Sequence, residues 1–130
     1  MKQHEIWLLK AENDLKSAEK LVEGDDPVLD TAIYHTQQCA EKALKAYLVF
    51  FEKPVRKIHD LDVLLSDCIE IDNSFKVLRD YTIILNPYSA AFRYPGEILD
   101  PSMEDVLEAK SCAKSVLDFV SEKICLPGEV

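Results

Sequence analysis

The chain is poor in the residues that make tight turns, with three glycines and six prolines in 130 residues. This scarcity disfavours an all-β architecture with many hairpins. Long apolar runs are also missing, since the longest stretch without a charged residue covers residues 81–92 and contains Asn86-Pro87. A membrane-spanning helix needs about 20 consecutive apolar residues. We therefore expect no membrane span, and the charges close to Met1 argue against a signal peptide.

Positive charge is also in short supply. There are 15 Lys and Arg against 24 Asp and Glu, which gives a formal net charge of −9. This balance disfavours DNA or an anionic membrane as a partner. The exception is a local excess of cations over one carboxylate in residues 42–57, formed by Lys42, Lys45, Lys53, Arg56 and Lys57 against Glu52. If a polyanion binds, we expect it to bind there.

Motifs for metal and nucleotide binding are absent from the sequence. The four cysteines are far apart, and none has a histidine at the spacing of a zinc site: Cys39, Cys68, Cys112 and Cys125. We expect them to be reduced, buried thiols of a cytoplasmic protein. The three glycines form no phosphate-binding loop, and neither HExxH nor Glu-x-x-His occurs. We therefore expect no metal and no cofactor, and we assign no catalytic residue.

Apolar residues recur at spacings of three and four along nearly the whole chain, which is the period of an amphipathic α-helix. The pattern predicts a first helix over residues 4–23 that stops at Gly24. A long second helix is expected to reach residue 51, with Asp26 as its N-cap, Pro27 at its first position and Pro54 beyond its end. Because its apolar arc covers about half the circumference, this helix should be central and pack on several neighbours.

The second half of the chain predicts three further helices, the first of which is short. His59 or Asp60 can cap the first of them. The next should start after residues 72–74 and stop at Asn86-Pro87, with an irregular segment over 86–101.

The last helix begins at Asp100-Pro101 or at Ser102 with Asp105. The predicted fold class is therefore all-α, an up-and-down helical bundle of four to five helices. We expect one domain over residues 1–130, with its core at about 4–125.

A polar stripe interrupts the apolar second helix, formed by Tyr34, Gln38, Glu41 and Lys45. Glu41 and Lys45 form an i,i+4 pair in the favourable orientation, which stabilises a helix by a few tenths of a kcal/mol. One interpretation is a solvated helix face that holds this ion pair. The other is a polar seam between helices or between subunits, which better explains the choice of Tyr34 and Gln38.

Two other segments contain candidate binding residues. His59 is either an acid or base or a residue held by the turn that starts a helix. Arg93 lies among Tyr88, Tyr94 and prolines, and its planar guanidinium suits a phosphate or a carboxylate. The alternative for Arg93 is an anchor to a helix carboxylate. The candidate ligand- or phosphate-binding residues are therefore Arg93, Tyr94, Tyr88, His59 and Lys45.

The order of these segments resembles the HEPN domain family, named for higher-eukaryote and prokaryote nucleotide binding. The resemblance extends from about residue 4 to 125. It rests on Trp7 with Asp14-Leu15, the segment from Tyr34 to Ala46, His59-Asp60-Leu61, Arg93-Tyr94-Pro95 and a final helix. It implies a helical bundle that forms a homodimer, with a small nucleotidyltransferase as its partner in a toxin–antitoxin-like pair.

Many HEPN proteins are metal-independent ribonucleases, so the sequence can be searched for their catalytic motif. Their motif is an Arg followed roughly four to six residues later by a His in the dimer cleft. That motif is absent here, because Arg56 lies too close to His59 and no His follows Arg79 or Arg93. We expect a dimeric binding module, with a nucleotide or RNA as a further ligand. The alternatives are a ribonuclease that uses Arg93 with Tyr94 or His59, and a structural adaptor without a ligand.

Overall fold

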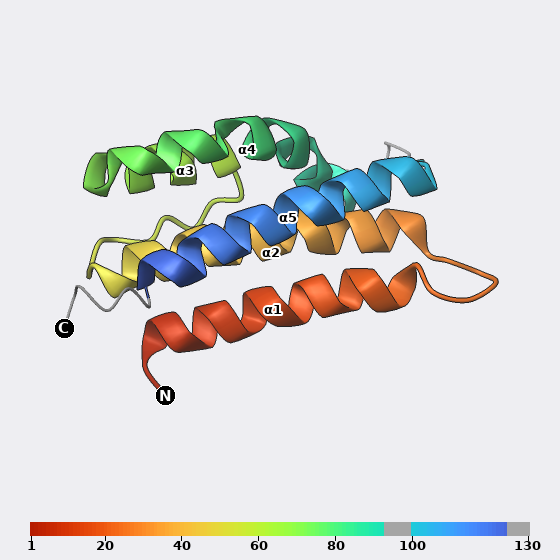
Figure 1. The fold of residues 1–130 in the computed structure, drawn as a ribbon, viewed down its shortest axis with the longest axis horizontal. Helices are drawn as coiled ribbons and strands as arrows, with labels where there is room; N and C mark the ends of the chain where they lie inside the picture. The colour runs from red at the N-terminus through yellow and green to blue at the C-terminus, as the bar shows by residue number, and fades with distance from the viewer. Residues whose placement is uncertain (93–99, 125–130) are drawn as a thin grey trace.

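The computed structural model describes residues 1–92 and 100–124, and over these residues it is an all-α bundle without strands (Figure 1). Its five α-helices are α1 (Gln3–Leu21), α2 (Leu29–Phe50), α3 (Leu61–Ile71), α4 (Arg79–Leu85) and α5 (Met103–Ile124). Two 3₁₀ helices flank α4, namely η1 (Asn73–Leu78) and η2 (Asn86–Phe92). The predicted fold class is confirmed. Within the described ranges, no helix is both long and apolar enough to cross a membrane.

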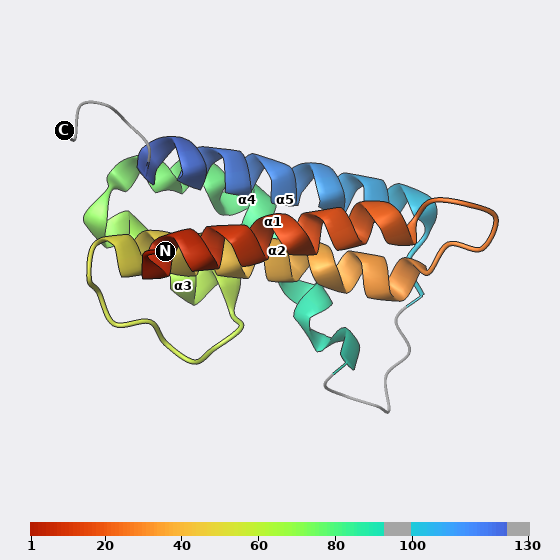
Figure 2. The same ribbon diagram turned by 90° about the horizontal axis from the view of Figure 1, so that it is seen from below.

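The helix α2 is the centre of the bundle. It packs against α1 and α5 along its length and against α3, with α3 and α4 forming a further layer (Figures 1 and 2). Fourteen of its 22 residues are buried, as its wide apolar arc predicts. Aromatic rings join three elements in the core: Phe75 of η1 lies 4.3 Å from Tyr47 of α2 and 4.9 Å from Phe119 of α5, measured between ring centroids.

The start of α2 differs from the prediction. Asp26 is not its N-cap and Pro27 is not its first residue, because the helix begins at Leu29 with Val28 in the N-cap position. The backbone N–H of Val28 donates to the carbonyl of Leu21 at 2.8 Å, at the end of α1. This tertiary hydrogen bond holds Val28 outside the helix at φ −106° and ψ 87°.

The end of α2, at Phe50, lies within one residue of the predicted end at residue 51. The N–H of Glu52 donates to the carbonyl of Val49, and the N–H of Lys53 to that of Leu48, both at 2.9 Å. This pair of bonds is a Schellman motif, which needs a left-handed residue after the C-cap. Glu52 takes that place, with φ 56°. A glutamate therefore occupies a position that usually favours glycine.

Side chains cap the helices of the second half. Asp60, rather than His59, caps α3 by accepting from the N–H of Asp62 at 2.9 Å. The last helix starts with a reciprocal pair between Ser102 and Asp105: the N–H of Ser102 donates to Asp105 Oδ2 at 2.9 Å, and the N–H of Asp105 donates to Ser102 Oγ at 3.1 Å. Of the two predicted starts, this pair is the one found.

Two expectations for residues 72–92 are wrong. The single fourth helix is instead η1 followed by α4, with the carboxylate of Asp72 capping η1. Asn86-Pro87 ends α4 but is followed directly by η2, so residues 86–92 are helical rather than irregular. Pro87 is tolerated because it is the second residue of η2, where no intrahelical donor is required.

Candidate functional site

The polar stripe of α2 is buried. Gln38, Glu41 and Lys45 are 8%, 3% and 6% exposed. Lys45 Nζ lies 3.0 Å from Glu41 Oε2, so the expected i,i+4 ion pair forms away from bulk water. The same ammonium lies 5.7 Å from the centroid of the Trp7 ring on α1. A solvated helix face therefore does not describe these three side chains.

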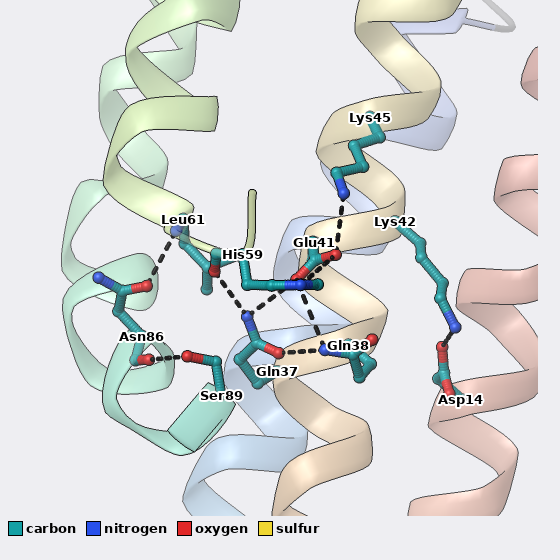
Figure 3. Close-up of polar contacts among 10 residues, drawn as sticks. All are labelled: Asp14, Gln37, Gln38, Glu41, Lys42, Lys45, His59, Leu61, Asn86 and Ser89. Carbon is teal, nitrogen blue, oxygen red and sulfur yellow. Dashed lines mark hydrogen bonds and ion pairs between the residues drawn. The ribbon is translucent and has the colours of Figure 1, made fainter. Parts of the chain in front are cut away.

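Glu41 is the hub of a polar network that joins α2 to the segment before α3 (Figure 3). Its Oε1 lies 2.9 Å from His59 Nδ1, and its other oxygen holds Lys45. Gln37, which is fully buried, donates from Nε2 to the backbone carbonyl of His59 at 3.1 Å. Gln38 donates to Gln37 Oε1 at 2.7 Å. We call these five residues, Gln37, Gln38, Glu41, Lys45 and His59, the Glu41 network.

The geometry of His59 fixes which ring nitrogen is available. A carboxylate only accepts hydrogen bonds, so Nδ1 carries the proton that it shares with Glu41. The remaining nitrogen, Nε2, makes no hydrogen bond or ion pair with any other described residue, and the side chain of His59 is 45% exposed. A buried carboxylate thus orients an accessible imidazole whose Nε2 can accept a proton.

Asn86 fixes the backbone next to this imidazole. Its Oδ1 accepts from the N–H of Leu61 at 2.9 Å, and its Nδ2 donates to Asp60 Oδ1 at 3.2 Å. Ser89 donates to the carbonyl of Asn86 at 3.3 Å (Figure 3). Residues from η2 therefore hold the start of α3, and with it the position of His59.

A second carboxylate clamps α1 to α2. Asp14 of α1 is 6% exposed, and its two oxygens lie 2.8 Å from His35 Nδ1 and 2.6 Å from Lys42 Nζ. These residues are not among those predicted from the sequence to form a site. The signal was present, however, because Asp14 shares a helical face with Ala11 and Ala18, at spacings of three and four, and both alanines are fully buried.

The structure describes three of the five candidate ligand-binding residues and brings two of those three together. Lys45 and His59 meet through Glu41. Tyr88 packs against the core, and burial, together with the nearby Asp105 of α5, raises its pKa. Arg93 and Tyr94 lie outside the described residues. Tyr34 is half-buried beside His35, with their ring centroids 5.9 Å apart.

The local excess of cations in residues 42–57 is largely neutralised. Lys42 pairs with Asp14, Lys45 with Glu41, and Arg56 with Asp67. Within residues 1–92 and 100–124, Lys53 and Lys57 make no ion pair. No group of three or more His, Cys, Asp or Glu side chains in the described part of the chain is arranged to hold a metal ion.

Three of the cysteines are free and buried: Cys39, Cys68 and Cys112. Burial raises the pKa of all three, and that of Cys68 reaches about 12. These thiols are therefore protonated and inert at neutral pH. Cys125 lies outside the described residues.

The family assignment follows from comparison with known proteins. The HEPN domain matches residues 4–124. The chain belongs to the HEPN domain family. This HEPN protein is 30% identical to Putative toxin MJ1304 of Methanocaldococcus jannaschii, in an alignment that covers 95% of this chain and 91% of that protein.

Solved structures agree with this assignment. An archaeal HEPN homologue of known crystal structure superposes with a TM-score of 0.74 at 28% identity, over 95% of this chain and 99% of that one. The crystal structure of TT1696 from Thermus thermophilus gives a TM-score of 0.79 at 27% identity, with the same coverage of 95% and 99%. The resemblance in the sequence is therefore confirmed at the level of family and fold.

Proposed function

We propose that this HEPN protein is a dimeric binding module of a toxin–antitoxin-like pair, with a nucleotidyltransferase as its protein partner and a nucleotide or RNA as a further ligand. The observation that carries the proposal is the end-to-end similarity to a HEPN relative named as a toxin, over 95% of this chain. Because nearly all of both chains aligns, the shared part includes the complete helical bundle and not one motif alone.

The side chains on α2 support binding over catalysis. Both carboxylate oxygens of Glu41 already bind side chains of the same chain, Lys45 at one oxygen and His59 at the other. The Arg-to-His spacing of the ribonuclease motif is absent from the sequence.

Exposed apolar side chains, Val77 at 62% and Ile83 at 56%, lie on η1 and α4, where a second copy of the chain would cover them.

One observation favours the ribonuclease alternative. His59 is accessible, and the buried Glu41 orients it as a general base would be oriented. Such a base would take the proton of a ribose 2′-hydroxyl while that oxygen attacks the adjacent phosphorus and the 5′-oxygen leaves. Removing a general base typically lowers the rate about 10²- to 10⁴-fold, so a His59→Gln variant reports directly on this chemistry.

Two assays separate these functions. The purified protein is mixed with the product of the adjacent gene, which we expect to be a nucleotidyltransferase, and complex formation is measured at micromolar concentration. The protein alone is incubated with structured and single-stranded RNA, next to His59→Gln and Arg93→Ala. We expect a complex and no appreciable cleavage. Robust cleavage that either variant abolishes would establish the ribonuclease instead, and neither complex nor cleavage would leave the structural adaptor.

A further inference from the structure

A groove lies beside the connection between α2 and α3, and its lining includes no residue of the Glu41 network. The connection, residues 51–60, forms a wide loop (yellow in Figure 2). The groove has a volume of about 710 Å³ and is lined by Leu48, Phe51, Lys53, Pro54, Arg56, Asp67, Glu70 and Ile71. This volume lies within the range of about 300–1,000 Å³ that is typical of ligand sites.

The charged residues of this groove are separated by sign between its two sides. The loop contributes two cations, Lys53 and Arg56, whereas α3 contributes two carboxylates, Asp67 and Glu70. The remaining lining is apolar and includes Phe51, which is 42% exposed although it is a large aromatic residue. A ligand that fits this lining needs an apolar body and charges of both signs.

One pair of opposite charges is already satisfied and the other is not. Arg56 donates from Nε and Nη2 to the two oxygens of Asp67, at 2.9 and 3.3 Å, which ties the loop to α3. Lys53 and Glu70 make no side-chain hydrogen bond or ion pair with any residue in 1–92 or 100–124, and both are exposed. These two side chains are therefore available to an incoming anion and an incoming cation.

We propose that this groove docks a peptide segment of a protein partner, in which an apolar side chain is flanked by one acidic and one basic residue. The acidic residue pairs with Lys53, the basic residue with Glu70, and the apolar side chain packs on Phe51. The carboxylates of α3 disfavour a nucleic-acid strand, which would place phosphates beside Asp67 and Glu70. The inference rests on the proposed function only in that the partner protein supplies the segment.

The test begins with blocked tripeptides, so that it does not depend on the partner. Ac-Glu-Phe-Lys-NH₂ is titrated into ¹⁵N-labelled protein and followed by NMR, next to the uncharged Ac-Gln-Phe-Gln-NH₂ and free phenylalanine. We expect saturable shifts at the groove residues and affinity about three- to tenfold higher for the charged peptide, the range for two exposed ion pairs. Lys53→Glu should abolish this preference, and Lys57→Glu, a loop cation outside the lining, should preserve it.

Three results would overturn the proposal: no saturable shifts at millimolar peptide, equal affinity for the charged and the uncharged peptide, or binding of free phenylalanine but not of the peptide. The partner then gives a separate readout. A wild-type complex whose affinity is unchanged by Phe51→Ala and Lys53→Glu would refute the groove and leave the proposed function intact. Peptide binding without any nucleotidyltransferase complex would refute the proposed function and support the groove.

Discussion

Replacing Glu41 by glutamine tests whether the Glu41 network is a buried electrostatic unit. The substitution keeps the size of the side chain and removes its charge. Lys45, whose side chain is 8% exposed, then loses the one carboxylate that neutralises it. His59 keeps an acceptor, the amide oxygen, but loses a charged one.

The expected loss of stability follows from this burial. Removing one partner of a buried ion pair costs about 3–5 kcal/mol, because the remaining charge is left without compensation. The Lys45 stem can carry its ammonium toward water, so we expect the low end, about 3 kcal/mol. Removing both charges in Glu41→Gln/Lys45→Met should recover about 1–2 kcal/mol of that loss.

Urea denaturation of the variants measures these free energies of unfolding. An exposed pair on α5 provides a matched control, since Lys114 Nζ and Asp118 Oδ2 have the same i,i+4 spacing and the same 3.0 Å separation, but side chains 64% and 56% exposed. Asp118→Asn should cost no more than about 0.5 kcal/mol. If Glu41→Gln costs as little as Asp118→Asn, burial does not make the Glu41–Lys45 pair important for stability, contrary to our expectation.

Three further predictions follow from local features. Glu52→Gly should raise the free energy of unfolding by about 1 kcal/mol in thermal denaturation, because φ 56° is unfavourable for a residue with a Cβ; Glu52→Ala should give no increase, and an equal gain in both would contradict this. Hydrogen bonding from Lys123 lowers the pKa of Asp72 from 3.8 to about 2. Because the pKa of Asp72 is lower in the folded state, the ionised carboxylate stabilises the fold above its ordinary pKa, and this stabilisation is lost as the pH falls toward 2. In urea titrations, Lys123→Gln should therefore flatten the dependence of the free energy of unfolding on pH. An unchanged pH profile would contradict the role given to Lys123. Cys39 and Cys68, whose pKa values are raised by burial, should resist maleimide at pH 8 until urea is added, as read by peptide mapping; labelling of the folded protein would show that they are accessible.

Four of the helices, α1, α2, α3 and α5, could be predicted because each has an apolar face with a period near 3.6 residues. Their ends were harder, since tertiary contacts decide them. Val28 stays outside α2 because its N–H donates to the carbonyl of Leu21. The Asp26-Pro27 pattern is a typical helix start, but it carries no information about that hydrogen bond. Asn86 does end α4, as predicted, but its side chain also accepts from the N–H of Leu61, 25 positions away, and no local pattern indicates that bond.

In the candidate site, too, the contacts within one helix could be predicted from the sequence, whereas the contacts between distant segments could not. The Glu41–Lys45 pair is visible in the sequence because one helix sets its spacing. The contact of Glu41 with His59 joins residues 18 positions apart, and only the path of the connecting loop brings them together. Gln37 was missed because a buried amide in an apolar arc gives no spacing signal until its partner, the carbonyl of His59, is known.

The most direct test of the central claim is the molar mass of the protein in solution, alone and with the proposed nucleotidyltransferase partner, by size-exclusion chromatography with light scattering. For the protein alone, we expect twice the chain mass of 14.8 kDa. With the partner, the peak should move to a larger mass that contains both proteins. A single-chain mass that the partner leaves unchanged at micromolar concentration would contradict the claim that this HEPN protein is a dimeric binding module.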